Sequence, residues 1–548
     1  MRNYPVFLIL LAMLFFRPAA AVFAVGSDAD REASTREGVT TVTKARKASD
    51  MIDPSSFYVN EELFASSLPI VVLELEDGDV LARGLTARLT VYDRIGGDNS
   101  LTDVPASTAL IDLQEKQDYP ARGKITYALA LAGADSEEPS EAVALAGLPS
   151  GKQWLLRGST HDKGMLRNGL AYELGRYLMP EATPESRFCE VLFLFNGAYR
   201  YEGLHLLVQS IDDVHRKLAA PGKEGVLLRY VTGRARQTEN VVRVGNKYFH
   251  PLPLRSDEPL TREEGRKIAV ELEKLESVLH SVSPSTFLAY NKQLDEESAI
   301  GFFLLNSMMM NVFDDVVPFA LLKNKDGKFQ FIPDWEFDDS IDNELERTHP
   351  LPYDRGKVVV EPMSVFSRRP PVWTILGQGG TIRDLRIYPY YRALEGEKFI
   401  WMDSFFLSRP YLSGLYNTYT RCREEHFSST KLLGLVDVLA LRLGHAIERD
   451  WMRWEQEYTG AAGPNLIPFE DVKGVIHDRQ TTSFDQELVK ISHCLKKQND
   501  FLGQNIENLY WMSTDLYAKE KTGNKQAGYA LITLLVIALI IFLLTRKL

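Results

Sequence analysis

The chain has 548 residues, more than one ordinary hydrophobic core accommodates, so two or more subdomains are expected. Its formal net charge of −11 argues against a nucleic-acid-binding protein. Only three cysteines occur, Cys189, Cys422 and Cys494, which excludes a fold built on a disulfide framework.

The N-terminal residues have the composition of a targeting segment. Residues 1–24 combine a basic start, a short apolar stretch and small residues, which predicts a secretory signal peptide cleaved after Ala24. An uncleaved anchor is the alternative. Residues 25–56 are polar and poor in aromatic side chains, which predicts a flexible leader.

The C-terminal residues predict a membrane anchor. Residues 527–545 carry no charged side chain, and at about 1.5 Å per residue they would just span a bilayer core. Arg546 and Lys547 follow, and positive flanks favour the cytoplasmic side. The sequence therefore predicts a single-pass membrane protein with a large extracytoplasmic domain, in the periplasm or at the cell surface, and a cytoplasmic C-terminus.

The first half of the remaining chain predicts a sheet, a helix and a hairpin. Apolar runs separated by turn residues between residues 68 and 131 predict an antiparallel sheet, with a further strand at residues 154–157. Apolar side chains at helical spacing predict a helix over residues 162–178. Asn196-Gly197 between two apolar runs predicts a β-hairpin within residues 187–209.

The second half predicts mainly helices. Thr261 and Glu264 form a capping-box pattern that opens a helix to about residue 282, and an apolar helix is expected over residues 296–311. Residues 324–327 predict the turn of a second hairpin. After a Pro- and Arg-rich connector, the chain to about residue 515 predicts helices, most clearly over residues 430–454.

Acidic and apolar residues alternate directly after the second hairpin, where residues 331–343 read FIPDWEFDDSIDN. A strand would place Asp334, Glu336 and Asp338 on one face, and Trp335 and Phe337 on the other. Three carboxylates repel each other unless a cation lies among them, and their oxygens suit Mg²⁺, Mn²⁺ or Ca²⁺. The stretch predicts a divalent-metal site, and a solvated acidic edge is the alternative interpretation.

Three motifs occur in order: WLLRGSTHDKGMLRNGLAYEL at residues 154–174, NGAYRYEGLHLL at residues 196–207 and DWEFDDSIDN at residues 334–343. Together they resemble the CotH-type family of spore-coat protein kinases. The resemblance implies an α+β, two-lobed protein-kinase-like fold, with an antiparallel-sheet N-lobe and a mainly helical C-lobe. It places the kinase core at residues 57–345. Residues 346–515 would be a helical part of the same lobe or a second subdomain.

The resemblance implies phosphoryl transfer from ATP to protein Ser or Thr with the help of Mg²⁺. The implied metal ligands are carboxylate and carboxamide side chains: Asp334, Glu336, Asp338 and Asn311. The implied catalytic groups are an acid that orients the hydroxyl and basic groups near the phosphates: Asp314, Asp315, Lys124 and Arg167. The implied nucleotide contacts come from a strand lysine and the first long helix: Lys124, Asp162, Lys163, Arg167, Asn168 and Glu173.

The residues themselves leave simpler interpretations open. Asp162 and Arg167 suit an ion pair at a helix start, Asp314 and Asp315 suit a turn, and a lone strand lysine such as Lys124 is often a surface residue.

Two features depart from the family pattern. Glu336 stands where the family has Asp, and the family's Arg-Gly-x-Ser-Ser element is missing before Lys124. Two hypotheses follow. The first is an envelope-anchored kinase that uses ATP and Mg²⁺ on a protein substrate. The second is a catalytically weak or dead module that binds an envelope or extracellular-structure protein during assembly. A Ca²⁺-stabilised surface protein is a third alternative.

Overall fold

The computed structural model describes residues 47–511, except for positions 76–84, 117–122, 133–140, 232–240, 246, 255–258, 280–285, 287, 312–318, 342, 344–404, 406–408, 460–468, 471–474, 478–480, 505 and 508–509. All of these described residues belong to one compact unit, Lys47–Leu548. The unit contains both helices and mixed sheets, so the predicted α+β class is confirmed.

Seven strands form a closed barrel, whereas the sequence predicted an antiparallel sheet without closure by a parallel pair. Their order around the barrel is β2 (Ile70–Glu74), β3 (Leu85–Tyr92), β5 (Ser107–Lys116), β6 (Thr126–Leu131), β7 (Gln153–Arg157), β9 (Ala198–Gln209) and β8 (Ser186–Phe195). The barrel closes because β2 pairs with β8 in parallel, with Ile70 opposite Glu190. Tyr127 and Leu129 fill the interior, whereas Thr126 and Ala128 are half-buried on the outer face of the same strand.

A second sheet has five strands, in the order β11 (Val242–Val244), β12 (Lys247–Pro253), β10 (Val226–Tyr230), β13 (Phe319–Lys323) and β14 (Phe329–Pro333). All four of its strand pairs are antiparallel. Helix α4 (Arg262–Leu279) packs against β11, and helix α6 (Glu296–Met308) packs against β14.

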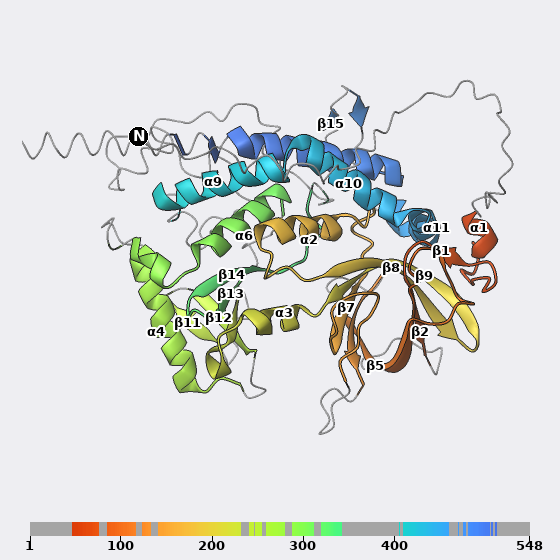
Figure 1. The fold of residues 1–548 in the computed structure, drawn as a ribbon, viewed down its shortest axis with the longest axis horizontal. Coiled ribbons are helices and arrows are strands. Elements are labelled where there is room, and N and C mark those ends of the chain that lie inside the picture. The colour runs from red at the N-terminus through yellow and green to blue at the C-terminus, as the bar shows by residue number, and fades with distance from the viewer. Residues whose placement is uncertain are drawn as a thin grey trace, which may run out of the picture. The chain divides into compact units, whose positions relative to one another are not determined.

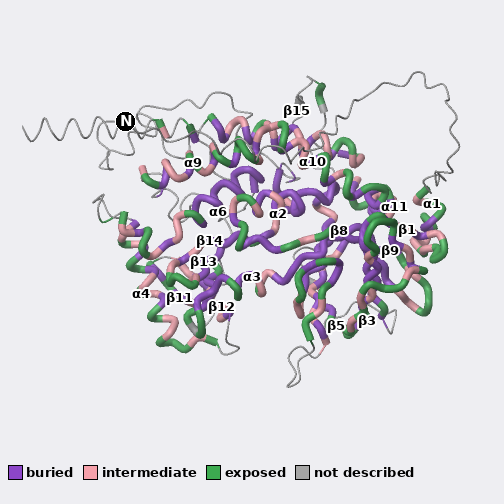
Figure 2. Tube along the Cα trace, viewed as in Figure 1, coloured by how far each residue is buried: buried purple, intermediate pink, exposed green. Residues whose placement is uncertain are grey.

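Helices cover both β-structures (Figure 1). Helix α2 (Arg167–Leu178) contacts α6, which contacts α9 (Arg409–Glu425), while α10 (Ser429–Leu443) contacts α2. Helix α11 (Ala446–Thr459) packs on β9 of the barrel, and residues 484–504 are also helical. Figure 2 shows α2 and α6 largely buried. Every residue of α6 from Ser298 to Met308 is buried, which explains why its sequence is apolar on all sides.

The remaining elements are short. They are α1 (Ala48–Met51), α3 (Ile211–Leu218), the 3-10 helices Gly222–Glu224 and Leu288–Lys292, and the two-residue strands β1 (Ala65–Ser66), β4 (Asn99–Ser100), β15 (Phe469–Glu470) and β16 (Ile476–His477). Strand β1 pairs with β4, and β15 pairs with β16.

Local sequence signals place several elements correctly. Asn196 and Gly197 both have positive φ, 48° and 76°, and they join β8 to β9 as predicted. The capping box forms before α4, where the Thr261 amide donates to Glu264 Oε2 at 2.8 Å and the Glu264 amide donates to Thr261 Oγ1 at 3.3 Å. The helix predicted over residues 430–454 is instead two helices, α10 and α11, because Gly444 breaks it with φ at 51°.

No helix within the described ranges is both long and apolar enough to cross a bilayer. This finding corrects the predicted fold with a C-terminal transmembrane helix and the predicted single-pass membrane location, neither of which the structure supports. Residues 1–24 and 527–545, on which the signal-peptide and anchor predictions rest, lie outside the described residues.

Candidate functional site

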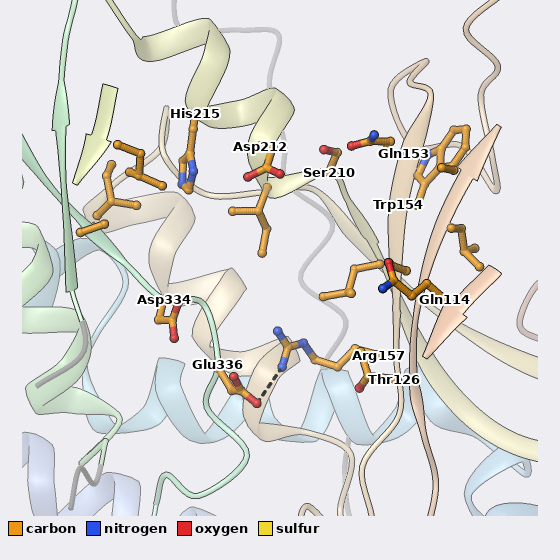
Figure 3. Close-up of a pocket in the computed structure, with 18 of the residues that line it drawn as sticks. Gln114, Thr126, Gln153, Trp154, Arg157, Ser210, Asp212, His215, Asp334 and Glu336 are labelled. Atoms are coloured by element: carbon orange, nitrogen blue, oxygen red, sulfur yellow. Dashed lines mark ion pairs between the residues drawn. The ribbon is translucent and has the colours of Figure 1, made fainter. Parts of the chain in front are cut away.

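A cleft of about 750 Å³ separates the outer face of the barrel from the second sheet (Figure 3). Strands β5, β6 and β7 line its barrel side. The start of α3, strand β10 and the residues that follow β14 line the opposite side. The volume falls within the roughly 300–1,000 Å³ that is usual for small-molecule sites.

The acidic stretch enters this cleft, but not as a strand. Strand β14 ends at Pro333, and Trp335 has φ at +56°, which no extended strand allows. The predicted alternation still holds in burial, because Trp335 and Phe337 are fully buried while Asp334 and Glu336 line the cleft. Trp335 is fixed by helix α2: the Tyr172 hydroxyl donates to its carbonyl oxygen at 3.0 Å, and Gly175 leaves room for its ring.

A small network of charges forms at this end of the cleft. Arg157 Nη1 lies 3.6 Å from Glu336 Oε1 and 3.9 Å from Asp338 Oδ2. Asn168 Nδ2 donates to Asp338 Oδ1 at 2.6 Å, and Asn168 Oδ1 accepts from the Phe337 amide at 3.0 Å. The Asp338 side chain is only 15% exposed. Its burial raises the pKa of Asp338 to about 7, although the Arg157 charge opposes the rise.

These residues fit a Mg²⁺ ion that a nucleotide helps to hold. Mg²⁺ usually takes one or two carboxylates from the protein, and waters and substrate phosphates complete its shell. Glu336 and Asp338 supply that pair, and the described residues contain no group of three or more ligands that would form a site without a nucleotide. The raised pKa of Asp338 also shows that the positive charge of Arg157 does not offset the cost of burying this carboxylate.

The two predicted amide residues position these acids. Both ends of the Asn168 amide are engaged, so Asn168 orients Asp338 rather than offering a free ligand. Asn311 Nδ2 donates to Asn306 Oδ1 at 3.2 Å and to the Glu336 carbonyl oxygen at 3.4 Å. Asn311 therefore supports the backbone of the acidic stretch.

Arg167 joins three parts of the chain and has no exposed surface. It forms ion pairs with Asp162 at 2.7 Å and with Glu487 at 2.6 Å, and its Nε donates to the Ser340 carbonyl oxygen at 2.7 Å. Lys163 Nζ donates to the Thr481 carbonyl oxygen at 3.0 Å. The Asp162–Arg167 ion pair at the helix start is thus present. The hydrogen bond from Arg167 to the Ser340 carbonyl oxygen anchors the acidic stretch to α2.

Lys124 does not line the cleft. Its ammonium is fully buried, 2.7 Å from Asp450 Oδ1 and 2.9 Å from the Tyr458 hydroxyl, both on α11. Burial lowers the pKa of Lys124, and the Asp450 charge opposes that change. Glu173 pairs with Arg176 and Arg442, each at 3.0 Å, and not with Lys124.

A family model described as CotH kinase protein matches residues 124–502, which is more than half of the chain. The chain belongs to the CotH kinase protein family. The predicted resemblance is therefore confirmed. The CotH region includes α11 and the helical residues up to 502, which supply Asp450 and Glu487. A comparison with curated proteins gives no match.

Three acids of interest lie outside the residues that the structure describes. Asp314, Asp315 and Asp342 lie among positions that the structure does not describe. The catalytic assignment of Asp314 or Asp315 therefore stays a prediction.

Sequence reasoning missed several residues that the structure places in or near the cleft. Arg157 was recognised only as the end of a strand, although alternation with the interior residue Leu156 indicates that Arg157 points out of the barrel. Asp450 carried no local signal, because its contact with Lys124 spans 326 residues. Asp212 and His215 of α3 were also missed, and the N-cap Ser210 that begins this helix directly after β9 was their only signal.

Proposed function

We propose that the cleft binds a Mg²⁺–ATP complex and that the chain transfers the terminal phosphoryl group to a Ser or Thr hydroxyl of a protein substrate. The observation that carries the proposal is that Glu336 and Arg157 line one end of a cleft of nucleotide size, with Asp338 3.9 Å from the same Arg157 guanidinium. Membership of the CotH kinase protein family supports the same activity.

The Asp338 carboxylate supports a cation at this position. A carboxyl group with a pKa near 7 is half protonated at neutral pH, because Arg157 at 3.9 Å does not offset the cost of burial. A divalent ion would favour the ionised form much more strongly than a single distant guanidinium. Asp338 is therefore better suited to a loaded site than to an empty one.

Each residue has a role in the proposed reaction. When bound, Mg²⁺ would neutralise the charge that develops on the transferred phosphoryl group. Glu336 and Asp338 would hold the ion, and Arg157 would donate hydrogen bonds to phosphate oxygens. Asp314 or Asp315 is the proposed acid that orients the substrate hydroxyl, as the family resemblance implies.

The activity can be tested by incubating the full chain with Mg²⁺ and ATP and mapping phosphate on its own Ser and Thr residues by mass spectrometry. We expect phosphorylation by the wild type, and none by Asp338→Asn, which keeps the shape but removes the charge. Asp326→Asn is the matched control, because Asp326 is exposed in the turn between β13 and β14. Equal phosphorylation by wild type and Asp338→Asn would contradict the assignment.

A second candidate is a CotH module that binds a nucleotide or a partner protein without transferring phosphate. The buried Lys124 favours it, because its ammonium pairs with Asp450 rather than facing the cleft. The replacement of the family's Asp by Glu336 also favours it, since Mg²⁺ tolerates little change in ligand geometry. Nucleotide binding without phosphorylation, restored to activity by Glu336→Asp, would identify this weakened form.

A further inference from the structure

Asp338 lies in a tight turn, residues 337–340, whose two halves are held by consecutive residues of helix α2. The Ser340 amide donates to the Phe337 carbonyl oxygen at 3.1 Å and closes the turn. Asn168 binds the first half, through the Phe337 amide and the Asp338 carboxylate. Arg167 binds the second half, since its Nε donates to the Ser340 carbonyl oxygen at 2.7 Å. The position of Asp338 therefore depends on both residues of α2.

The backbone on either side of this turn is strained. Trp335 has φ at 56° and Ile341 has φ at 47°, a region that bulky and β-branched residues rarely adopt. Such a residue costs on the order of 1–3 kcal/mol and persists only where surrounding contacts hold it. At Ile341 these contacts are two hydrogen bonds: its amide donates to the Met309 carbonyl oxygen at 2.8 Å, and its carbonyl oxygen accepts from Arg167 Nη2 at 3.2 Å. Loss of the second bond would let the turn relax.

Glu487 holds the Arg167 guanidinium from outside the cleft. It belongs to the helical residues 484–504 and is not among the residues that line the cleft. Its Oε1 lies 2.6 Å from Arg167 Nη2, the nitrogen that also donates to Ile341, and neither side chain has exposed surface. Although burial raises the pKa of Glu487, Lys490 and Arg167 bring it to about 2, so the carboxylate is ionised at neutral pH.

Two carboxylates together fix the orientation of this guanidinium. Asp162 Oδ1 lies 2.7 Å from Arg167 Nη1, and Glu487 holds Nη2. A guanidinium is planar and its donors form a rigid fork, so fixing both terminal nitrogens also directs Nε and the remaining Nη2 hydrogen at the carbonyl oxygens of the turn. With Asp162 alone, the group could rotate about its contact at Nη1.

We propose that Glu487 is a positioning residue of the metal site: through Arg167 it holds the turn in the shape in which Glu336 and Asp338 bind the same divalent ion. The inference rests on the proposed function, since it concerns the affinity of that site for Mg²⁺. Residues that orient metal ligands from behind typically change metal affinity by about 10–100-fold. The helical residues 484–504 thereby control a site in a cleft that Glu487 does not line.

The test measures ATP dissociation constants of the full chain by calorimetry, with Mg²⁺ and with a chelator, and takes their ratio as the Mg²⁺ advantage. We expect an advantage of at least about tenfold in the wild type and about twofold or less in Glu487→Gln, which keeps the size of the side chain but removes its charge. ATP affinity in the chelator should be unchanged, because the residues that line the cleft are the same.

Glu190→Gln is the matched control. Glu190 of β8 also has no exposed surface, and it lies 2.5 Å from Nη2 of a buried arginine, Arg449 of α11. Breaking this pair should lower the melting temperature, as in Glu487→Gln, because it leaves a buried charge without its partner. Since the pair does not contact the turn, the variant should keep the full Mg²⁺ advantage.

Hydrogen exchange of the unliganded proteins gives a readout that needs no nucleotide. The amides of Ser340 and Ile341 are both hydrogen-bonded in the turn region. In Glu487→Gln, exchange at residues 337–341 relative to exchange in α6 should be at least about tenfold faster than in the wild type. In Glu190→Gln the same ratio should be unchanged.

The outcomes separate this inference from the proposed function. If Glu487→Gln lowers the melting temperature but keeps the Mg²⁺ advantage and the protection of residues 337–341, Glu487 has only a structural role and the inference is overturned. An equal loss of the Mg²⁺ advantage in Glu190→Gln would also overturn it. If wild-type ATP binding gains nothing from Mg²⁺, the proposed function fails, and the exchange data alone decide whether Glu487 holds the turn.

Discussion

Replacing Asp338 by Asn should stabilise the unliganded protein and abolish binding of Mg²⁺–ATP. The folded chain retains the Asp338 proton up to a pH of about 7, whereas an unperturbed Asp releases it near 3.8. Stability therefore falls as pH rises from about 4 to 7, and the full cost of the ionised carboxylate is present above pH 7. Asn carries no charge and still accepts the hydrogen bond from Asn168, so it avoids that cost.

The magnitude follows from the size of the pKa change. A rise of about three units corresponds to an upper limit of roughly 4 kcal/mol, at about 1.36 kcal/mol per unit. For a unit of several hundred residues this limit amounts to a rise in Tm on the order of 4 °C. Thermal unfolding of both proteins at pH 5 and pH 8 measures the effect.

The pH dependence distinguishes this explanation from a general change in packing. The Tm advantage of Asp338→Asn should be roughly threefold larger at pH 8 than at pH 5, because at pH 5 the folded carboxyl group keeps its proton and only part of the cost is present. A variant that is less stable than the wild type at pH 8, or whose advantage is the same at both pH values, would refute the reasoning.

Three further predictions concern neighbouring charges. Glu487→Gln should lower the unfolding free energy at pH 7 by up to about 3 kcal/mol. Burial raises the pKa of Glu487, but the charges of Lys490 and Arg167 outweigh it and bring the pKa to about 2. Urea unfolding measures the loss of stability, which should shrink only below pH 4.5. Lys124→Met and Asp450→Asn should each destabilise by about 3–5 kcal/mol, since each leaves a buried group unpaired, and the double variant should cost less than the sum. Additive effects in that cycle would mean that the pair is not coupled. Arg157→Lys should weaken Mg²⁺–ATP binding about tenfold in calorimetry, since Lys lacks the forked donors of Arg, and unchanged affinity would remove Arg157 from the phosphate site.

The local parts of the fold could be predicted because their signals are contained in a few residues. Asn196-Gly197 specifies its hairpin through positive φ, and Thr261 with Glu264 specifies a helix start. The acidic stretch was also found from a local pattern, the alternation of acidic and apolar residues. The structure shows the same alternation in burial, although the backbone is not extended at Trp335.

The parts that failed depend on contacts between distant residues. Closure of the barrel requires Ile70 to pair with Glu190 in parallel, and no local pattern announces such a pairing. Lys124 was assigned to the nucleotide, whereas the structure pairs it with Asp450 of α11. Asp450 carried no local signal, so the sequence could not show which acid Lys124 would meet.

The central claim is that Glu336 and Asp338 hold a divalent ion against a triphosphate in the cleft. The most direct measurement is the affinity of the full chain for ATP as Mg²⁺ is varied, by calorimetry at pH 8. The account predicts tight binding with Mg²⁺, binding weaker by at least about tenfold with a chelator, and loss of the Mg²⁺ effect in Asp338→Asn. ATP affinity that is the same with and without Mg²⁺, or a Mg²⁺ effect that survives Asp338→Asn, would contradict it.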